Sequence, residues 1–544
     1  MAATSDAEKH AGITVHGTKG FSPGRCLRAT RDYEPGELIA TFDDPLVAFP
    51  DAAGSKTTCH HCLVRNVKLF GCAGCEKAVS YCGSECQRAN WKLVHSKECK
   101  VFRKVRAAVG KDWLPTPVRA LVQILFRLSE VQDVVANLEG HSDKFRARKE
   151  LWENMKLQAY AGLHYVGRKE DDANLNLAAE ILCKIQTNSF DRFDADTGQS
   201  GTFLDPLLAM ANHSCIPNAV VLFWKRKAYL RAEMPVKAGD GITISYIDYT
   251  KPLAFRRQDL DLYHFSCACP RCMNDMDVYQ VCGASPMLKS NDATISPGAE
   301  RLGSRPVSAG PSDQEAWRAR VEAIYAESAG NPFEKPKVNP TVGERLDKLR
   351  DDWEMCRPLI DAKLWALEPL AKTIRSATMY YLAADRLANA LATSCLAALY
   401  CDPVQYVAPF KQLRLTGLML IAKVLTQTSV PDTESLRKGA HPDVVVAMNK
   451  SDQASMLHAI LLLVTSLAPK GHSTEWVVLE EAKVMLSGIE SIAGRENDAL
   501  LLRQWVADPE RDGPAKTFFR ERVLSPIEEL AHLAPLVIAA DVDS

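Results

Sequence analysis

Eight cysteine and histidine residues between positions 59 and 99 have the spacing of metal ligands. They form four close pairs: Cys59-x2-Cys62, Cys72-x2-Cys75, Cys82-x3-Cys86 and His95-x3-Cys99. Zn²⁺ takes four thiolate or imidazole ligands in a tetrahedron, and one close pair supplies two of them, so the segment predicts two closed zinc sites. His60 and His61 lie inside the first pair and are expected to be exposed rather than ligating.

Spacing alone leaves the pairing of these ligands open. Our interpretation is an interleaved arrangement, in which the first ion takes Cys59, Cys62, Cys82 and Cys86. The second ion then takes Cys72, Cys75, His95 and Cys99.

A third group of thiols follows much later in the chain. Cys267-x-Cys269-x2-Cys272 offers three ligands, and Cys215 supplies the fourth if strand pairing brings the Asn212-His213-Ser214-Cys215 turn beside them. The alternative for Cys215 is a buried free thiol. Eleven of the 17 cysteines are then ligands, and the other six are expected to be ordinary core or surface thiols.

Four short motifs lie in a fixed order along the chain: Gly24-Arg25-Cys26-Leu27-Arg28-Ala29-Thr30, Asn212-His213-Ser214-Cys215, Ile244-Ser245-Tyr246-Ile247-Asp248 and Phe265-Ser266-Cys267-Ala268-Cys269-Pro270-Arg271-Cys272. This order resembles the SET domain of the SET-and-MYND protein lysine methyltransferase family. The ligand spacing between 59 and 99, with Tyr81 before Cys82 and Trp91 in the last helix, resembles the MYND zinc finger of that family. The resemblance covers roughly residues 11 to 273.

The resemblance implies a knot-like β fold, S-adenosylmethionine as cofactor and three structural zinc ions. It assigns Tyr246 to the transfer site, where its hydroxyl orients the amine, and places Phe190 and Tyr263 along the lysine channel. The implied cofactor-binding residues are Gly24, Arg25, Asn212, His213, Tyr246 and Phe265. Three positions depart from the usual family pattern: Cys26 replaces a glycine, Gly241 an acidic residue and Asp205 a residue that is often tyrosine.

The chemistry explains these residue types. Methyl transfer from a sulfonium is an in-line displacement, so the site must align a neutral lysine amine with the methyl group and exclude water. A lysine in water has a pKa of about 10.4. A narrow apolar channel beside the positive charge of the cofactor favours the neutral amine.

The elements that position these residues indicate an α+β fold of several parts. We expect the SET-type sheet in two pieces, 11–50 and 188–249, with strands at Ile13–Val15, Arg25–Thr30, Glu37–Phe42, Ala219–Trp224, Ala228–Ala232 and Ile242–Tyr246. Between the two pieces lie the zinc finger (59–99) and a helical insert (100–187). A post-SET zinc segment (255–273) and a linker (283–313) lead to a helical domain (314–544), which resembles a tetratricopeptide-like array without a clean 34-residue consensus.

Composition narrows the partners of the protein. Lys+Arg of 66 against Asp+Glu of 67 gives a formal net charge of −1, which excludes a global attraction to nucleic acid or to an anionic membrane. Ten Lys or Arg against three Glu within 59–106 leave a local anion or nucleic-acid contact open. The apolar stretch Met456–Ala468 is shorter than the roughly 18 residues of a membrane span, so no membrane association is expected.

We therefore predict a zinc-containing, S-adenosylmethionine-dependent lysine methyltransferase that acts on histone or non-histone protein. It is expected to be a monomer in the nucleus, the cytoplasm or both, and to meet protein partners through the MYND finger. The alternative is a MYND adaptor whose SET domain is weakly active or inactive. Tyr246, Asn212 and His213 favour the enzyme, because an adaptor has little reason to keep this set.

Overall fold

The computed structural model describes residues 10–17, 24–194, 198–304, 311–329, 340–428 and 439–542. The chain forms two compact units. The first comprises residues 1–246 and 259–267, and the second comprises residues 247–258 and 268–544.

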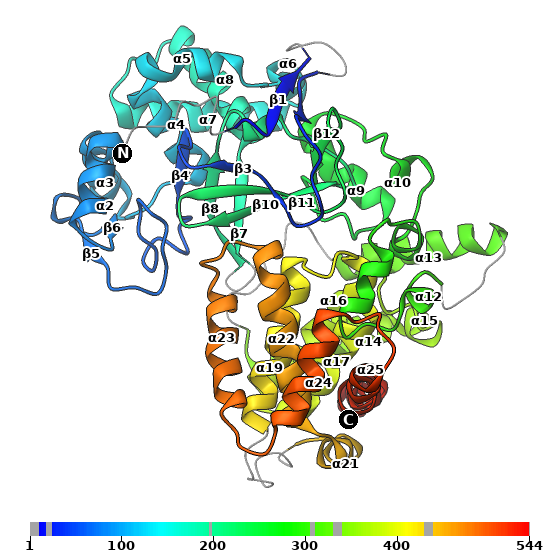
Figure 1. Ribbon diagram of the computed structural model, residues 1–544. Coiled ribbons are helices and arrows are strands. Elements are labelled where there is room, and N and C mark those ends of the chain that lie inside the picture. Colours follow the sequence, from blue (N-terminus) through cyan, green and yellow to red (C-terminus); the bar gives the residue numbers. More distant parts are fainter. Residues whose placement is uncertain are drawn as a thin grey trace. The chain divides into compact units, whose positions relative to one another are not determined.

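Small sheets make up the centre of the first unit (Figure 1). One sheet has the order β1-β2-β12-β9, a second β10-β11-β3 and a third β4-β8-β7. Their bounds are β1 Ile13–His16, β2 Cys26–Ala29, β3 Leu38–Phe42, β4 Val47–Phe49, β7 Phe190–Asp194, β8 Gly198–Leu204, β9 Asn212–His213, β10 Ala219–Trp224, β11 Lys227–Ala232 and β12 Gly241–Ile244. The six strands predicted from the sequence are all present, with ends that differ from the prediction by at most two residues.

The sheets join parts of the chain that are far apart in sequence. Leu230 of β11 pairs with Ala40 of β3, and Ile242 of β12 pairs with Leu27 of β2. Alternating buried side chains on these strands, Leu27, Ala40, Leu230 and Ile242 among them, form one apolar core. The SET-type sheet is therefore split in the chain and closed in space.

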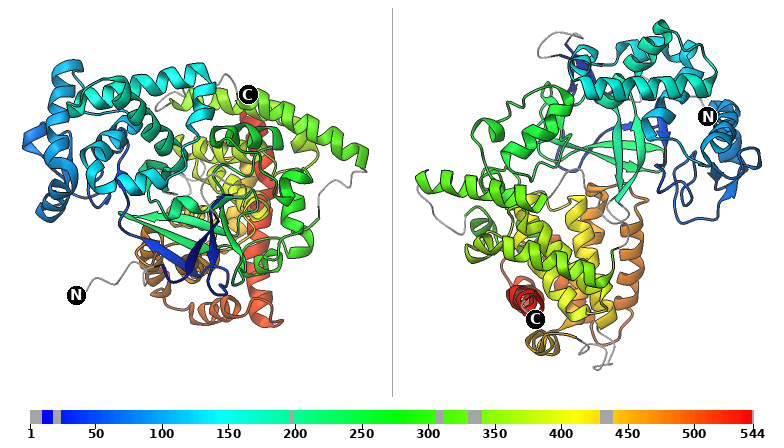
Figure 2. Two further views of the ribbon diagram at one scale, coloured as in Figure 1. Left: turned by 90° about the horizontal axis from the view of Figure 1, so that it is seen from above. Right: turned by 180° about the vertical axis from the view of Figure 1, so that it is seen from behind.

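The zinc finger and the helical insert occupy the interval between β4 and β7. The finger contains a two-stranded sheet and short helices: β5 Phe70–Gly71, η1 Ala73–Cys75, β6 Ser80–Tyr81, α2 Ser84–Asn90 and η2 Trp91–His95. The insert contains α3 Ser96–Val109, α4 Thr116–Phe126, α5 Leu128–Asn137, α6 Ser142–Ala147, α7 Lys149–Val166 and α8 Asp172–Asn188. Helices α4, α7 and α8 pack against one another around a second core. Their ribbons are coloured from light blue to turquoise in Figure 2.

Helix ends in the insert follow local sequence signals. The side chain of Asp171 accepts a hydrogen bond from the backbone N–H of Asn174 and so caps α8. Helix α7 ends at Gly167, whose φ of 74° is left-handed and suits glycine. Helix α8 ends at the Asn188-Ser189-Phe190 motif, so this motif has a defined place between helix and strand.

Short helices precede and follow the last strands along the chain. The turn η3 Leu208–Met210 precedes β9, and α9 Leu253–Leu260, η4 Asp261–Tyr263 and α10 Pro270–Met273 follow β12. The second unit continues with α11 Val278–Gly283, η5 Leu288–Ala293, α12 Ala299–Leu302, α13 Pro311–Ala329, α14 Val342–Met355, α15 Arg357–Asp361, α16 Leu370–Ala383, α17 Leu387–Leu396, η6 Ala397–Cys401, α18 Asp402–Gln405, α19 Gln412–Thr428, α21 Pro442–Lys450, α22 Gln453–Gly471, α23 Val477–Glu490, α24 Glu496–Ala507, α25 Pro514–Phe519, η7 Arg520–Leu524 and α26 Ser525–Val542. The helical C-terminal region is confirmed. The tetratricopeptide-like repeat stays a prediction.

Residues 283–304 differ from the predicted linker. They contain η5 and α12, and Ile295 and Leu302 are buried in the core of the second unit. Their polar composition misled the prediction, because Thr294 and Ser296 are also buried and are satisfied by hydrogen bonds to the carbonyl of Asn291. Residues 305–310 of the predicted linker lie outside the described residues.

Within the described residues, three helical stretches are long and apolar enough to cross a membrane by length and composition: Leu387–Gln405, Gln453–Gly471 and Pro514–Val542. The second stretch contains Met456–Ala468, the apolar segment that is by itself too short for a membrane span. The helix around this segment is longer, with 19 residues. Most of the first two stretches is buried inside the protein. The expected absence of membrane association stays a prediction.

Candidate functional site

Three clusters of soft ligands lie where the sequence predicted them. The predicted pairing is confirmed: Cys59, Cys62, Cys82 and Cys86 form one cluster, and Cys72, Cys75, His95 and Cys99 form another. The third comprises Cys215, Cys267, Cys269 and Cys272. Within each cluster the ligand atoms lie within 4.8 Å of one another, a spacing that suits four ligands around one Zn²⁺.

Each cluster supplies four protein ligands. Two clusters consist of four cysteines each, and one consists of three cysteines and a histidine. Closed sets of this kind hold structural zinc, because they leave no coordination position for water or substrate. The fold of the finger depends on such ligands, since its own core is a small group of cysteines with few larger apolar side chains.

His60 departs from the prediction of exposure. Its ring is buried at 1% exposure, Nδ1 accepts the backbone N–H of Ser80 at 3.1 Å, and Nε2 lies 3.1 Å from the hydroxyl of Ser55. Burial lowers the pKa of His60 to about 3, so the ring is neutral. His60 is outside the three clusters, as predicted, and it joins the finger to the loop that precedes it.

The Asn-His motif and the Tyr246 motif are placed side by side by a short parallel pair of strands. Thr243 of β12 pairs with Asn212 of β9, and Ile244 pairs with His213. This pairing lets Nδ1 of His213 accept the backbone N–H of Tyr246 at 3.0 Å. Two motifs separated by some thirty residues of sequence thereby become one structural element.

The N-terminal glycine motif reaches the same place. The side-chain amide of Asn212 donates to the carbonyl of Arg25 at 3.2 Å. Gly24 has a φ of 76°, a left-handed conformation that favours glycine. Asp205, one of the family departures, caps the turn before Asn212 by accepting the backbone N–H groups of Leu207 and Leu208 at 3.0 and 2.9 Å.

Four aromatic rings surround the end of β12. The centroid of Tyr246 lies 4.9 Å from that of Tyr263, 5.3 Å from that of His213 and 6.3 Å from that of Phe265. The ring of Phe265 is 39% exposed, which leaves a face available for a planar ligand.

Two cavities meet at these rings. The larger, of about 630 Å³, is lined by Gly24, Arg25, Asn212, His213, Tyr246, Tyr263 and Phe265 and by part of the helical insert. The smaller, of about 360 Å³, is lined by Phe190, Tyr246 and Tyr263 with residues of α4, α8 and β8. Tyr246, Tyr263, Thr187, Asn188 and Ala209 line both cavities. The structure thus gathers every predicted cofactor and channel residue around two cavities that share part of their lining. The roles of those residues stay predictions.

Tyr246 has a defined polarity at this junction. Its hydroxyl donates to the carbonyl of Ala211 at 2.6 Å, which uses its single proton and leaves oxygen lone pairs as acceptors. Burial raises the pKa of Tyr246, and burial together with the carboxylates of Asp191 and Asp259 raises the pKa of Tyr263. Both phenols are therefore neutral at physiological pH.

Sequence reasoning missed the contribution of the helical insert. Glu139 lines the larger cavity and accepts a hydrogen bond from Arg25 at 3.2 Å, and His141 and Lys144 line it as well. Asn188, the last residue of α8, donates to the carbonyl of Glu139 at 2.7 Å and so fixes that loop. Polar residues of a helix–loop segment have no periodic signal that marks them as site residues, so only Asn188 could have been singled out.

The fold and the site define a class: a split SET domain that carries a zinc finger and a helical C-terminal region. A family model for the SET domain matches residues 24–247. The SET domain and MYND-type zinc finger protein 6 of Schizosaccharomyces pombe is 31% identical over 265 residues, which are 48% of this chain and 53% of that protein. The N-lysine methyltransferase SMYD2-B of Danio rerio is 33% identical over 276 residues, 47% of this chain and 60% of that protein.

A longer match is to the N-lysine methyltransferase SMYD2-A of Danio rerio, which is 30% identical over 347 residues, 61% of this chain and 72% of that protein. The chain belongs to the SET and MYND domain-containing protein family. It spans between half and two thirds of the length of the first two relatives above.

Proposed function

We propose that this protein is an S-adenosylmethionine-dependent protein lysine methyltransferase. The observation that carries the proposal is Tyr246, which lines both cavities and whose neutral phenol already donates its only proton to the carbonyl of Ala211. A methyl donor in one cavity and an amine in the other would meet there. The SMYD2 relatives are named N-lysine methyltransferases, which supports the same reaction.

The larger cavity fits the cofactor. Its volume of about 630 Å³ lies within the range of ligand pockets, and its lining combines an aromatic face with polar groups. Phe265 would cover the adenine, and the carboxylate of Glu139 is a suitable acceptor for ribose hydroxyls. Arg25 and Lys144 offer positive charge for a carboxylate. When bound, S-adenosylmethionine supplies a methyl group on a sulfonium.

The smaller cavity fits a lysine side chain. Phe190, Pro117 and Ala120 give it an apolar wall, and the charged ammonium is disfavoured beside that wall. The lone pairs of the Tyr246 hydroxyl accept an amine N–H and direct the amine lone pair toward the larger cavity. Asp51 and Asp191 also line this cavity and favour a basic segment as its occupant.

The test is an unbiased transfer assay with labelled cofactor against a proteome extract. We expect labelled protein whose modified residue is lysine, together with saturable cofactor binding measured by calorimetry. A protein that binds cofactor and labels nothing in the extract would contradict the proposal and favour the adaptor.

The finger has a feature of its own that favours protein contacts. Phe70 is 55% exposed, Trp91 47% and Val67 42%, although apolar side chains of this size are usually covered. We also propose that partner proteins bind the finger at these exposed side chains. Phe70→Ser should weaken such binding and leave methylation of a short peptide unchanged. The monomeric state and the location in nucleus or cytoplasm stay predictions.

A further inference from the structure

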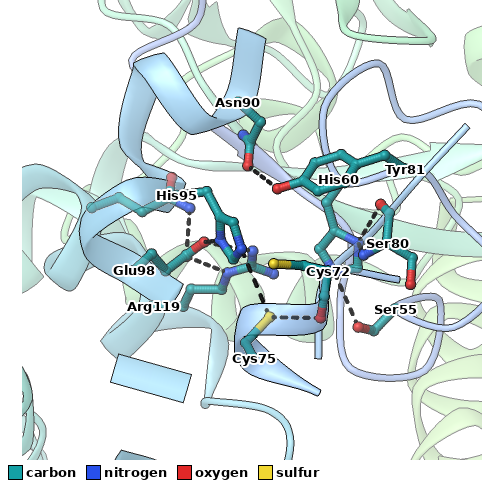
Figure 3. A network of polar contacts seen from close by, with 11 residues as sticks. Ser55, His60, Cys72, Cys75, Ser80, Tyr81, Asn90, His95, Glu98 and Arg119 are labelled. Carbon is teal, nitrogen blue, oxygen red and sulfur yellow. Dashed lines mark hydrogen bonds and ion pairs between the residues drawn. The ribbon is translucent and has the colours of Figure 1, made fainter. Parts of the chain in front are cut away.

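A buried polar network joins the second zinc cluster of the finger to helix α4 of the insert (Figure 3). Its central residue is Glu98, which is 0% exposed and lies one position before the ligand Cys99. His95 lies on one side of its carboxylate and Arg119 on the other. The reaction proposed above uses none of these side chains directly.

The first link runs from the metal site to Glu98. Nε2 of His95 lies 3.7 Å from the sulfur of Cys75 in the same cluster, so this nitrogen is the one that would face the ion. The other ring nitrogen, Nδ1, lies 3.4 Å from Oε2 of Glu98. An imidazole that ligates zinc commonly donates its second N–H to a carboxylate, which fixes the ring and strengthens it as a ligand.

The second link runs from Glu98 to α4. Oε1 of Glu98 accepts Nε of Arg119 at 2.8 Å and Nε2 of Gln123 at 2.8 Å. Arg119 and Gln123 are four residues apart and so share one face of the helix. The guanidinium of Arg119 also lies over the rings of Phe49, at 4.5 Å, and Phe102, at 5.2 Å.

The third link runs from α4 to the smaller cavity. Thr116, Pro117 and Ala120, on the neighbouring face of α4, line that cavity. Phe49 belongs to β4 and pairs with Thr202 of β8, which lines it too. Two walls of the cavity are thus held to the finger through Arg119.

We infer that Glu98 is a positioning residue that ties metal occupancy of the Cys72, Cys75, His95, Cys99 cluster to the shape of the amine-side cavity. The inference depends on the proposed function in one respect only, the assignment of the smaller cavity to the substrate amine. A buried carboxylate and guanidinium stabilise each other only as a pair, and loss of one partner leaves the other charged and uncompensated. When His95 is fixed by the ion, Glu98 is fixed, and Arg119 and Gln123 hold α4 in place.

Glu98→Gln cuts the link to the metal site and weakens the link to the helix. The amide keeps one oxygen for Nε of Arg119 and for Gln123. Its NH2 group replaces Oε2, which faces Nδ1 of His95 and also accepts a hydrogen bond from Nη2 of Arg119 at 3.3 Å. Arg119→Lys is the converse change, because it alters the helix side and leaves His95 and Glu98 in place. Glu85→Gln, an exposed glutamate of the same finger, is the matched control.

The primary measurement is amide exchange of residues 116–126 in the full protein, with zinc and after chelation, because it needs no catalysis. In wild type, metal removal should speed exchange in α4 roughly 5- to 150-fold, the usual range of coupling between two sites. In Arg119→Lys, exchange in α4 should already be fast and should change little with metal. Glu98→Gln should lower zinc affinity roughly 10- to 100-fold and shift the absorption bands of the Co²⁺-loaded finger.

With an identified substrate, both variants should raise KM for that protein and leave the cofactor Kd, measured separately, unchanged. If the amide-exchange rate of α4 in the wild-type protein is the same with zinc and after chelation, the inference is overturned, whether or not the protein methylates lysine. Equal zinc affinity and equal Co²⁺ spectra for Glu98→Gln and Glu85→Gln would overturn it as well. Absence of methyl transfer alongside metal-dependent exchange in α4 would instead count against the proposed function alone.

Discussion

Tyr246 is the residue whose chemistry the structure defines most closely. Its proton is donated to the carbonyl of Ala211, and the residue lines both cavities. Tyr246→Phe removes the oxygen and keeps the ring. By analogy with the removal of one well-placed polar group from an active site, kcat should fall roughly 10²- to 10³-fold. The cofactor Kd, measured by calorimetry, should change little.

Tyr33→Phe is the matched control for that experiment. The Tyr33 hydroxyl also donates to a backbone carbonyl, that of Gly12, at 2.8 Å, and its ring is buried in the sheet core. This variant loses a similar hydrogen bond and should keep the wild-type kcat. Equal kcat values for Tyr246→Phe and wild type would remove Tyr246 from the transfer step.

The pKa of Tyr246 leads to a prediction about pH. Burial disfavours the phenolate and raises this pKa above its usual value of about 10. Tyr246 therefore stays protonated while the neutral fraction of the substrate lysine grows with pH. The usual pKa values of lysine and tyrosine both lie near about 10. We therefore expect kcat/KM to rise from about pH 7 to about pH 10, and we expect no decline in this range from ionisation of Tyr246. Tyr246→Phe should give a lower curve of the same shape, and a decline in this range that Tyr246→Phe abolishes would contradict the assignment.

At the residue scale, the zinc ligands could be identified from the sequence, whereas most residues that line the larger cavity or surround His60 could not. Cys72 and His95 are recognisable because zinc restricts both residue type and spacing. Glu139 and Lys144 are not, because a charged residue in a helical segment is usually on a solvated face, and only the packed insert brings these two to the cavity. The prediction for His60 was wrong for a related reason: the contacts that bury its ring, with Ser55 and Ser80, are supplied by folding.

Among the elements, the zinc finger depends most on bound metal. Its core consists mainly of the ligands themselves, with few larger apolar side chains such as Val79, Tyr81 and Phe102. Chelation should therefore unfold residues 59–99 before the helices beyond 314, because metal binding and folding share one free energy in such a domain. Amide exchange followed during chelation measures this order. Persistent protection of the finger in metal-free protein would show another source of stability.

Strand positions were predicted well and the packing of short polar segments was not. Period-two alternation in 227–232 marks a strand that buries one face, and the continuous apolar run in 219–224, rich in β-branched and aromatic residues, marks its neighbour. Residues 283–304 have the composition of a linker, yet Ile295 and Leu302 are buried in the core. Composition predicts disorder only when too little apolar surface is buried, and two well-placed side chains suffice to hold a short segment.

For the whole molecule, the three clusters predict a zinc content of three ions per chain. Elemental analysis of purified protein should give a ratio near three. Cys269→Ser should lower it by about one, because the third cluster then keeps three sulfur ligands. Cys282→Ser is the control, since Cys282 is buried in the second unit outside the clusters, and its ratio should stay near three. A wild-type ratio near two would exclude the third site and Cys215 as a ligand.

The split of the SET sheet has a consequence for synthesis on the ribosome. Strand β2, which contains Leu27, pairs with β12, which contains Ile242. At roughly 5 to 20 residues per second, about 10 to 40 s separate the emergence of these two strands. During that interval the finger already has all eight of its ligands and can fold on zinc, while β2 and β3 expose unpaired edges that invite association with other chains. In a nascent chain of this architecture the finger can therefore bind zinc before the sheet closes. The need for zinc in the finger then precedes the end of the interval in which chaperones must protect the strand edges.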